Sequence, residues 1–383
     1  MNYKELIVEL DIATGIVLAI FVLAIIIQFA YYLFVYLRVV LRKKKRNSSQ
    51  LDGTPPVSVI ICARNEEEYL AKNLTSILEQ DYPSFEVIVV NYCSEDNTEQ
   101  LLAELKQKYP HLRSTIIKKD GSFINFKKFA ATVGIKAAQH EWLLFTDADC
   151  KPECSLWIAS MSEHFVENKD IVLGYGGYSV QKGYLNKLIR YDSLFTTFQF
   201  FGFALLRRAY MGIERNLAYR KSLFFAHNGF AANAHIISGD NDLFVNKAAN
   251  KRNVAVAQSN TAYTRSTHKS TFKEWMWQKS KRIISGKHYK NSQNFWLTLE
   301  PVSRALMFVT FCVLMFVGAL WQQILMIFML RMIIFMSVVG TAVKRFNEPG
   351  ILQHVILFDM IMPFVHLHVY ILNKISSKHR KWN

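Results

Sequence analysis

Cysteine and acidic residues are scarce in this 383-residue chain. The five cysteines are an odd number without framework spacing, which excludes a secreted scaffold held by disulfides. Cys150 and Cys154 resemble half of a zinc site, but no second pair of Cys or His stands nearby, so we expect reduced thiols. The formal net charge is +16, from 46 Lys and Arg against 30 Asp and Glu. This excess favours an anionic partner: a nucleotide, a phospholipid surface or nucleic acid.

A long apolar run near the N-terminus predicts a membrane-spanning helix. Residues 14–40 are almost wholly apolar, and this run exceeds the roughly 20 residues that cross a bilayer core. A cleaved signal peptide fits poorly, because the preceding flank is acidic, the run is too long and no small-residue cleavage site follows. The basic run 42–46 comes next, which places this end in the cytoplasm and the N-terminus outside.

The C-terminal region holds three further apolar stretches. Residues 302–320 and 324–343 predict a helical hairpin that returns the chain to the cytoplasm. Residues 351–372 form a weaker span with basic residues on both flanks, so we expect a re-entrant or interfacial segment. Arg331 and Asp359 fall at membrane depth and should face protein, either along an acceptor path or in helix–helix contacts. We predict a multi-pass protein of the inner (cytoplasmic) membrane with a cytoplasmic catalytic domain.

The residues between these membrane segments predict a soluble α/β domain. We divide the chain into an anchor with its basic flank (1–47), this domain (48–299) and C-terminal membrane helices with a basic tail (300–383). Strand-like runs alternate with helical patterns, which implies right-handed crossovers and a mostly parallel, Rossmann-like sheet. The expected strands are 57–63, 85–90, 114–118 and 141–149, and the expected helices are 67–80, 97–109 and 128–139.

Polar clusters follow three of the predicted strands. They comprise residues 64–66, residues 91–98, and the pair Asp147 and Asp149. Ligands bind beyond the carboxyl ends of the strands in such sheets, so these clusters predict one binding crevice.

Two acidic groups suit different chemical tasks. Asp147 and Asp149 can hold a hard divalent cation, which would neutralise the diphosphate of a leaving nucleotide. The alternative for this pair is a solvated turn with a helix cap. Asp240, in the string SGDNDLF with Asp242, suits a general base that deprotonates an acceptor hydroxyl. Asp240 as the N-cap of a helix through Asn246 is the alternative, and both roles are compatible.

Residues 275–282, WMWQKSKR, mix aromatic and cationic side chains on a predicted helix. The cations suit a diphosphate, and the aromatic rings suit a sugar or the bilayer interface. A basic amphipathic helix lying on the bilayer surface is the alternative.

Together these stretches resemble the family-2 inverting glycosyltransferases, which have the nucleotide-sugar-binding α/β fold called GT-A. The chain is similar to membrane-anchored bacterial members with one N-terminal span and C-terminal apolar helices. The matching stretches are VSVIICARNEEEYL, VIVVNYCSEDNT, KKFAATVGIKAA, EWLLFTDADCKP, RNLAYRKSLFF, SGDNDLF and WMWQKSKR.

The resemblance implies a role for each matching site residue. Asp149, helped by Asp147, would hold Mg²⁺ or Mn²⁺ with the diphosphate, and Asp240 would be the general base. The donor would be a nucleotide-sugar, with a UDP-sugar as first expectation, and the acceptor a lipid-linked or cell-envelope glycan. We expect no nucleic-acid partner, because nucleic-acid binding explains neither the spans nor the Asp pair. The donor-binding residues would be Ala63, Arg64, Asn65, Glu66, Asn91, Asp96, Lys128, Asp147, Gln278, Lys281 and Arg282.

Three positions depart from the family pattern. Tyr92 stands where an Asp commonly contacts the base, and Gly239 replaces an acidic residue before Asp240. In the Gln-x-x-Arg-Trp motif, Lys281 and Arg282 take the Arg and Trp positions, which removes a carbohydrate platform. We therefore favour single-sugar transfer. A processive polysaccharide synthase and a non-catalytic nucleotide-sugar-binding membrane protein are the alternatives.

Overall fold

The computed structural model describes residues 3–42, 53–118, 126–236, 238–267, 271–318 and 320–376. The predicted basic flank at 43–46 and the basic tail from 378 onwards lie outside these ranges. The chain divides into two compact units, Lys43–Tyr289 and Met1–Arg42 with Lys290–Asn383.

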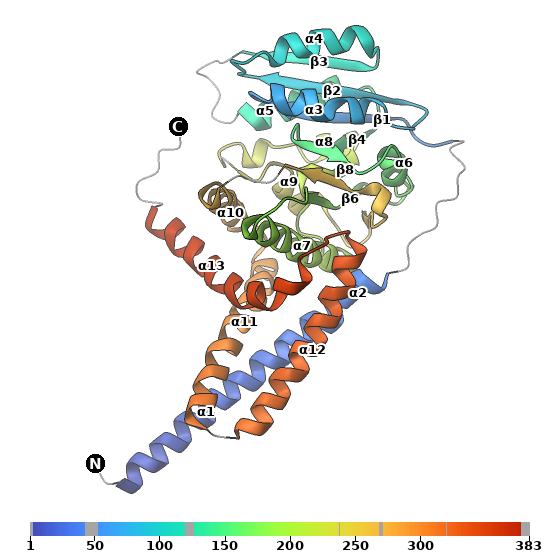
Figure 1. Cartoon of the computed structure of the whole chain (residues 1–383). Coiled ribbons are helices and arrows are strands. Elements are labelled where there is room, and N and C mark those ends of the chain that lie inside the picture. The colour runs from blue at the N-terminus through green and yellow to red at the C-terminus, as the bar shows by residue number, and fades with distance from the viewer. Residues whose placement is uncertain are drawn as a thin grey trace. The chain divides into compact units, whose positions relative to one another are not determined.

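The unit Lys43–Tyr289 is built on a seven-stranded sheet with the order β3-β2-β1-β4-β8-β6-β9 (Figure 1). Strand β1 pairs in parallel with β2 and β4, and β2 pairs in parallel with β3. Strand β8 runs antiparallel between β4 and β6. The predicted α/β fold with a mostly parallel sheet is therefore confirmed. The strands are β1 (Val57–Ala63), β2 (Phe85–Tyr92), β3 (Leu112–Ile117), β4 (Trp142–Phe145), β6 (Ile171–Leu173), β8 (Leu217–Arg220) and β9 (Val254–Val256).

A second sheet of three short strands has the order β5-β10-β7. Helices connect the strands of both sheets (Figure 1). The short strands are β5 (Cys150–Pro152), β7 (Gly176–Tyr178) and β10 (Thr264–Ser266). The helices are α3 (Glu67–Leu78), α4 (Thr98–Lys108), α5 (Phe126–Ala137), α6 (Trp157–Ser162), α7 (Tyr184–Leu205), α8 (Lys221–Ala226), α9 (Asp240–Ala248) and α10 (Phe272–Gly286), with 3-10 turns η2 (Glu214–Asn216), η3 (Ala231–Asn233) and η4 (Asn260–Ala262).

Hydrophobic strands and helix faces form a core that holds the strand ends of the main sheet in place. Strand β1 is buried along almost its whole length, and Leu70, Leu74 and Ile77 of α3 pack in the same core. Strand β4 ends at Phe145, before the expected bound at Asp149, so Asp147 and Asp149 follow the strand as predicted. The chain turns there instead, and the Cys150 N–H donates to the Asp147 carbonyl at 3.0 Å. Both aspartates consequently lie in a turn beyond the strand.

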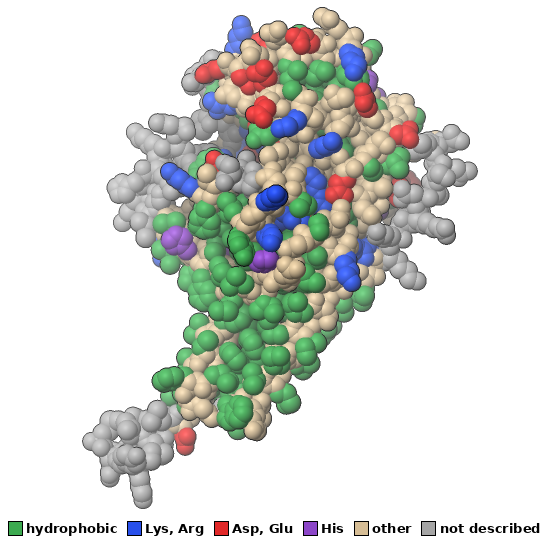
Figure 2. Space-filling model, viewed as in Figure 1, with side chains coloured by type: hydrophobic (Ala, Val, Ile, Leu, Met, Phe, Trp, Pro, Cys, Tyr) green, Lys and Arg blue, Asp and Glu red, His purple; other side chains and the backbone are tan. Residues whose placement is uncertain are grey.

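The second unit consists of long apolar helices. Four of them are long and apolar enough to cross a membrane by length and composition. Figure 2 shows hydrophobic side chains over the visible face of these helices, and Phe316 is 93% exposed. The predicted weak span forms a helix as well; whether it crosses the bilayer stays a prediction. The elements are α1 (Tyr3–Ala30), the π-helical η1 (Tyr31–Tyr36), α2 (Leu37–Leu41), α11 (Asn291–Val317), α12 (Trp321–Arg345), η5 (Leu352–His354) and α13 (Val355–Ser376).

A buried polar network connects the helices of this unit. Arg331 of α12 and Asp359 of α13 are both 0% exposed and form an ion pair, which confirms that they face protein. Arg304 of α11 donates to Asp359 at 3.1 Å and also pairs with Glu300. Arg331 donates to the Gln28 side chain at 3.0 Å. Two cations and two carboxylates balance in charge, which favours the helix-contact interpretation.

Candidate active site

The turn after β4 places two carboxylates where they can share a cation. Ligand atoms of Asp147, Asp149 and Cys150 all lie within 4.8 Å of one another. The Cys150 thiol donates to Asp149 Oδ1 at 3.5 Å, and burial raises its pKa well above the usual range. A thiol that keeps its proton is a poor metal ligand, whereas carboxylates suit Mg²⁺ or Mn²⁺. Cys154 contacts the Thr261 carbonyl instead, and it is not in this cluster.

The second sheet holds Asp149 in place. Ser266 of β10 donates its hydroxyl to Asp149 Oδ2 at 2.7 Å, and the Thr267 N–H donates to the Asp149 carbonyl at 3.2 Å. No sequence pattern marks Ser266, because only the pairing of β10 with β5 brings it to the turn.

Two consecutive lysines at the start of α5 contact different acidic groups. Lys127 Nζ lies 3.4 Å from Asp147 Oδ1 and 2.9 Å from Glu214 Oε2. Burial alone would lower the pKa of Lys127, but the carboxylates of Glu214 and Asp147 raise it well above the usual range. The sequence pattern predicts Lys128 as a site residue but does not indicate Lys127 or Glu214. Lys127 lies next to the predicted position, whereas Glu214 carries no motif signal.

Lys128 lies beside Asp240. Its ammonium donates to the carbonyls of Asn233 at 2.7 Å and Ile236 at 2.5 Å, and lies 3.6 Å from Asp240 Oδ1. Burial lowers the pKa of Lys128 and Asp240 partly offsets this. The expected donor-binding role of Lys128 stays a prediction.

Asp240 is the first residue of α9, and Gly239 occupies the N-cap position with φ +83°. The alternative in which Asp240 caps this helix is therefore wrong. The Asp240 side chain is 10% exposed, and burial raises its pKa although Lys127 and Lys128 lower it. A buried carboxylate with a raised pKa is a stronger base than an exposed one, which suits proton abstraction.

The departure at Gly239 has a steric explanation. A Cβ at this position would lie 2.6 Å from Ser285 Cβ and 2.9 Å from Asp242 Oδ1. The backbone also has a left-handed conformation that side chains disfavour. Asp242 accepts hydrogen bonds from Ser285 at 2.8 Å and Tyr289 at 2.9 Å, so its carboxylate is occupied by structural contacts.

The loops after β1 and β2 are joined by the residues predicted to line a nucleotide pocket. Asn65, with φ +53°, donates its N–H to Ser94 at 2.9 Å and accepts from the Glu95 N–H at 2.7 Å. Asp96 accepts from the N–H groups of Glu67 and Thr98 at 3.1 and 3.2 Å, and so holds the starts of α3 and α4.

The other predicted residues of this region differ in exposure. Ala63 is buried at the end of β1, Arg64 is exposed and Glu66 is half-buried, donating its N–H to Thr98 at 3.3 Å. Asn91 is buried, and its side-chain oxygen has no hydrogen-bond partner among the described residues. Burial raises the pKa of Tyr92 to about 12, so its hydroxyl stays protonated and can donate a hydrogen bond.

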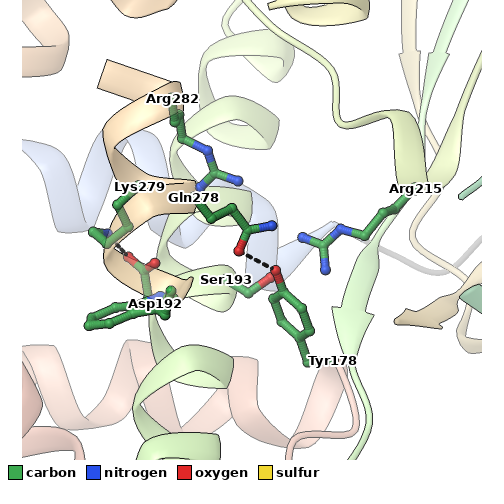
Figure 3. A pocket seen from close by; sticks show the side chains of 8 residues that line it. Tyr178, Asp192, Ser193, Arg215, Gln278, Lys279 and Arg282 are labelled. Carbon is green, nitrogen blue, oxygen red and sulfur yellow. Dashed lines mark hydrogen bonds and ion pairs between the residues drawn. The ribbon is translucent and has the colours of Figure 1, made fainter. Parts of the chain in front are cut away.

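Helix α10 brings two of its three predicted residues to a pocket (Figure 3). Gln278 accepts from the Tyr178 hydroxyl at 2.9 Å, while Arg282 donates to Thr196 at 3.0 Å. Lys281 lies over the exposed ring of Trp277, 3.3 Å from its centroid. The structure thus groups Gln278 with Arg282 and places Lys281 elsewhere. The pocket is lined by Tyr178, Asp192, Ser193, Arg215, Trp275, Gln278, Lys279 and Arg282.

Three cations and one carboxylate give this pocket an excess of positive charge. Lys279 pairs with Asp192 at 2.6 Å, which leaves the guanidinium groups of Arg215 and Arg282 without a carboxylate in the pocket lining. Arg215 stacks over Tyr178, 4.2 Å from the ring centroid (Figure 3). An anionic group is the complementary ligand.

Comparison with known proteins finds similar glycosyltransferases. Residues 58–233 match the model of glycosyl transferase family 2. An uncharacterized glycosyltransferase of Haemophilus influenzae is 30% identical over 130 residues, which covers 33% of this chain and 38% of that protein. A poly-beta-1,6-N-acetyl-D-glucosamine synthase of Staphylococcus epidermidis is 30% identical over 110 residues, which covers 27% of this chain and 24% of that protein. The matches therefore span well under half of either relative.

A solved structure shares the fold over nearly the whole chain. A mannosyltransferase of Pyrobaculum calidifontis, in complex with GDP-Man and Mn²⁺, has a TM-score of 0.58 at 16% identity. The match covers 94% of this chain and 99% of that one. The fold and these matches together define a glycosyltransferase domain of the GT-A type. The match to glycosyl transferase family 2 lies within this domain.

Proposed function

We propose that this protein transfers a sugar from a nucleotide-sugar donor to a lipid-linked or cell-envelope glycan acceptor, with inversion and with a divalent metal. The observation that carries the proposal is the arrangement around the start of α5. Lys127 contacts Asp147 and Lys128 contacts Asp240, so two adjacent residues connect the metal-binding turn with the base. Transfer needs both acidic groups at one donor, and this arrangement supports that requirement.

The site residues suit a single in-line displacement. Asp149 and Asp147 would hold Mg²⁺ or Mn²⁺, which supplies positive charge for the departing diphosphate. Asp240 accepts the proton of the acceptor hydroxyl as its oxygen bonds to the anomeric carbon. The bond from that carbon to the diphosphate breaks on the opposite side, which inverts the configuration. Lys128 stabilises the ionised form of Asp240 before the reaction.

The cationic pocket beside α10 suits the phosphate groups of the donor. Arg215 and Arg282 line it together with Gln278, and Lys279 is held by Asp192. Ala63, Arg64, Asn65, Glu66, Asn91 and Asp96 remain proposed nucleotide contacts. The Pyrobaculum enzyme was solved with GDP-Man and Mn²⁺, so both GDP-sugars and UDP-sugars are candidate donors, with UDP-sugars our first expectation.

The apolar helices support a membrane location. Four candidate spans lie within Asp11–Leu41 and between residues 291 and 374. We propose the inner (cytoplasmic) membrane with the catalytic domain in the cytoplasm, and we retain the division into 1–47, 48–299 and 300–383.

A donor screen tests the proposal. The full chain, purified in detergent, is incubated with a panel of UDP- and GDP-sugars, an acceptor lipid extract and Mn²⁺ or Mg²⁺, and nucleoside diphosphate release is measured. We expect metal-dependent release that EDTA abolishes. Asp149→Ala and Asp240→Asn should each lower the rate by about 100-fold or more.

Asp81→Asn is the matched control, because Asp81 is an exposed acid outside the site. Unchanged transfer in Asp149→Ala or Asp240→Asn, with the protein folded, contradicts the mechanism. A ladder of long products would identify a processive synthase instead, and nucleotide-sugar binding without turnover would identify a non-catalytic binder.

A further inference from the structure

Glu214 is the acidic residue of the site that the proposed mechanism leaves without a role. It begins η2, directly before β8, which pairs antiparallel with β4 and aligns Leu217 with Phe145. The Thr146 hydroxyl donates to the Arg215 carbonyl at 3.1 Å. These contacts hold Glu214 beside the turn that carries Asp147 and Asp149.

Lys127 holds the Glu214 carboxylate beside Asp147 of the metal-binding turn, and the charges of Glu214 and Asp240 interact. Lys127 bridges Glu214 to Asp147, at 2.9 Å and 3.4 Å respectively, and the next residue on α5 contacts Asp240. Burial, and then the nearby charges of Asp147 and Asp240, raise the pKa of Glu214 to about 7 although Lys127 lowers it. Glu214 is therefore close enough to both acidic groups to interact with their charges.

A structural role does not explain this placement. The Glu214 side chain is only 14% exposed, and among the described residues it forms an ion pair with Lys127. A third carboxylate beside Asp147 and Asp240 is repelled by both, and Asp147 already supplies a counter-charge for Lys127. Costly acidic groups in a crevice are typical of ligand binding.

We propose that Glu214, oriented by Lys127, binds hydroxyl groups of the donor sugar and selects among donors. This inference rests on the proposed function. In the proposed mechanism the donor diphosphate would lie at Asp147 and Asp149 and the acceptor hydroxyl at Asp240. The sugar ring would then lie between them, within reach of the carboxylate that Lys127 holds beside Asp147. A carboxylate accepts hydrogen bonds from neighbouring sugar hydroxyls, and Lys127 donates to their oxygens. A site built to bond a hydroxyl strongly rejects a sugar that lacks it or presents it in the wrong orientation.

Calorimetric titration separates recognition of the sugar from recognition of the nucleotide. The full chain in detergent with Mn²⁺ is titrated with UDP and GDP, then with UDP-glucose, UDP-galactose, UDP-N-acetylglucosamine and GDP-mannose. For Glu214→Gln, we expect affinity for the preferred nucleotide-sugar to fall about 10- to 100-fold, as for loss of charged hydrogen bonds. Affinity for the free nucleotide should stay within about twofold, and the preference among sugars should flatten. Glu99→Gln, an exposed glutamate of α4, is the matched control and should match the wild type.

Each other outcome has a distinct meaning. If Glu214→Gln keeps the wild-type preference among sugars, the inference is wrong while the proposed function stands. If the variant loses affinity for free nucleotide and for nucleotide-sugar equally, with an unchanged Tm, Glu214 contributes to binding of the diphosphate or the metal. The inference is then again wrong. If the wild type binds no nucleotide at all, the proposed function fails and the inference fails with it.

Discussion

Acidic side chains of similar chemistry have different roles here because their surroundings differ. Asp240 and Asp242 stand two residues apart at the start of α9. Asp242 accepts hydrogen bonds from Ser285 and Tyr289, whereas Asp240 is buried beside Lys128. Burial raises the pKa of Asp240, and a basic carboxylate near an acceptor is what transfer requires.

The pH dependence of the proposed transfer should report the ionisation of Asp240. The base acts only when ionised, so kcat/KM should fall as the pH drops through its pKa. Because burial raises that pKa, the acid limb should lie above the value of about 3.9 of an exposed aspartate. Lys128→Met removes a charge that lowers the pKa of Asp240, so the limb should move to higher pH. The measurement is kcat/KM against pH for the wild type and the variant.

Two lysine variants control this experiment. Lys128→Arg keeps the charge and should leave the limb near its wild-type position. Lys72→Met removes an exposed lysine of α3 and should change nothing. An acid limb that does not move in Lys128→Met, while nucleotide binding is retained, would show that Asp240 is not the titrating base.

At the scale of elements, the start of α9 depends on one glycine. Gly239 has φ +83°, and the helix that it precedes presents Asp240 to the site. An acidic residue here, as in the family pattern, would collide with Ser285 of α10. The close contact between Ser285 of α10 and the start of α9 therefore goes together with glycine in place of the family's acidic residue.

Gly239→Ala should destabilise the protein and displace the base. A residue with a side chain in a left-handed conformation costs about 1–3 kcal/mol, and the added Cβ would also meet Ser285. We expect a lower Tm of the full chain in detergent, with reduced transfer.

Gly286→Ala is the control, because the nearest atom to its Cβ is Tyr289 Cε2 at 3.9 Å. It should leave Tm and activity nearly unchanged. Equal Tm values for the two variants would refute the steric explanation of Gly239.

At the scale of the whole molecule, the membrane unit contains its own balanced network of charges. Arg331, Arg304, Asp359 and Glu300 are buried among apolar helices and pair with one another. Uncompensated charge is costly in such surroundings, so the network should hold α11, α12 and α13 in register.

Single and double substitutions separate pairing from packing in this network. Arg331→Leu and Asp359→Leu each leave one buried charge unbalanced, and each should cost about 3–5 kcal/mol. The double variant restores neutrality through Arg304 and Glu300, so its loss should be smaller than the sum of the two. The measurement is Tm in detergent. Strictly additive losses would mean that the residues do not act as a pair.

Much of the fold and part of the site follow from local sequence pattern. The burial of β1 and the spacing of Leu70, Leu74 and Ile77 predict a strand and a helix without any long-range information. Polar residues that follow a buried strand indicate the edge of the sheet, and this pattern identifies Asp147 and Asp149. Apolar runs longer than a bilayer is thick predict the membrane helices in the same way.

Tertiary structure alone decided which side chains meet at this edge. Glu214 and Ser266 reach the aspartates only because β8 pairs with β4 and β10 pairs with β5, contacts between segments far apart in the chain. Lys127 and Lys128 are equivalent in sequence pattern, and only the fold directs one to Asp147 and the other to Asp240. Periodicity records which face of an element is buried, but it holds no information about which distant partner that face contacts. Asp147, Asp149 and Asp240 were therefore predictable from sequence, whereas Glu214, the partners of these acidic groups, and the charge states that the partners set were not.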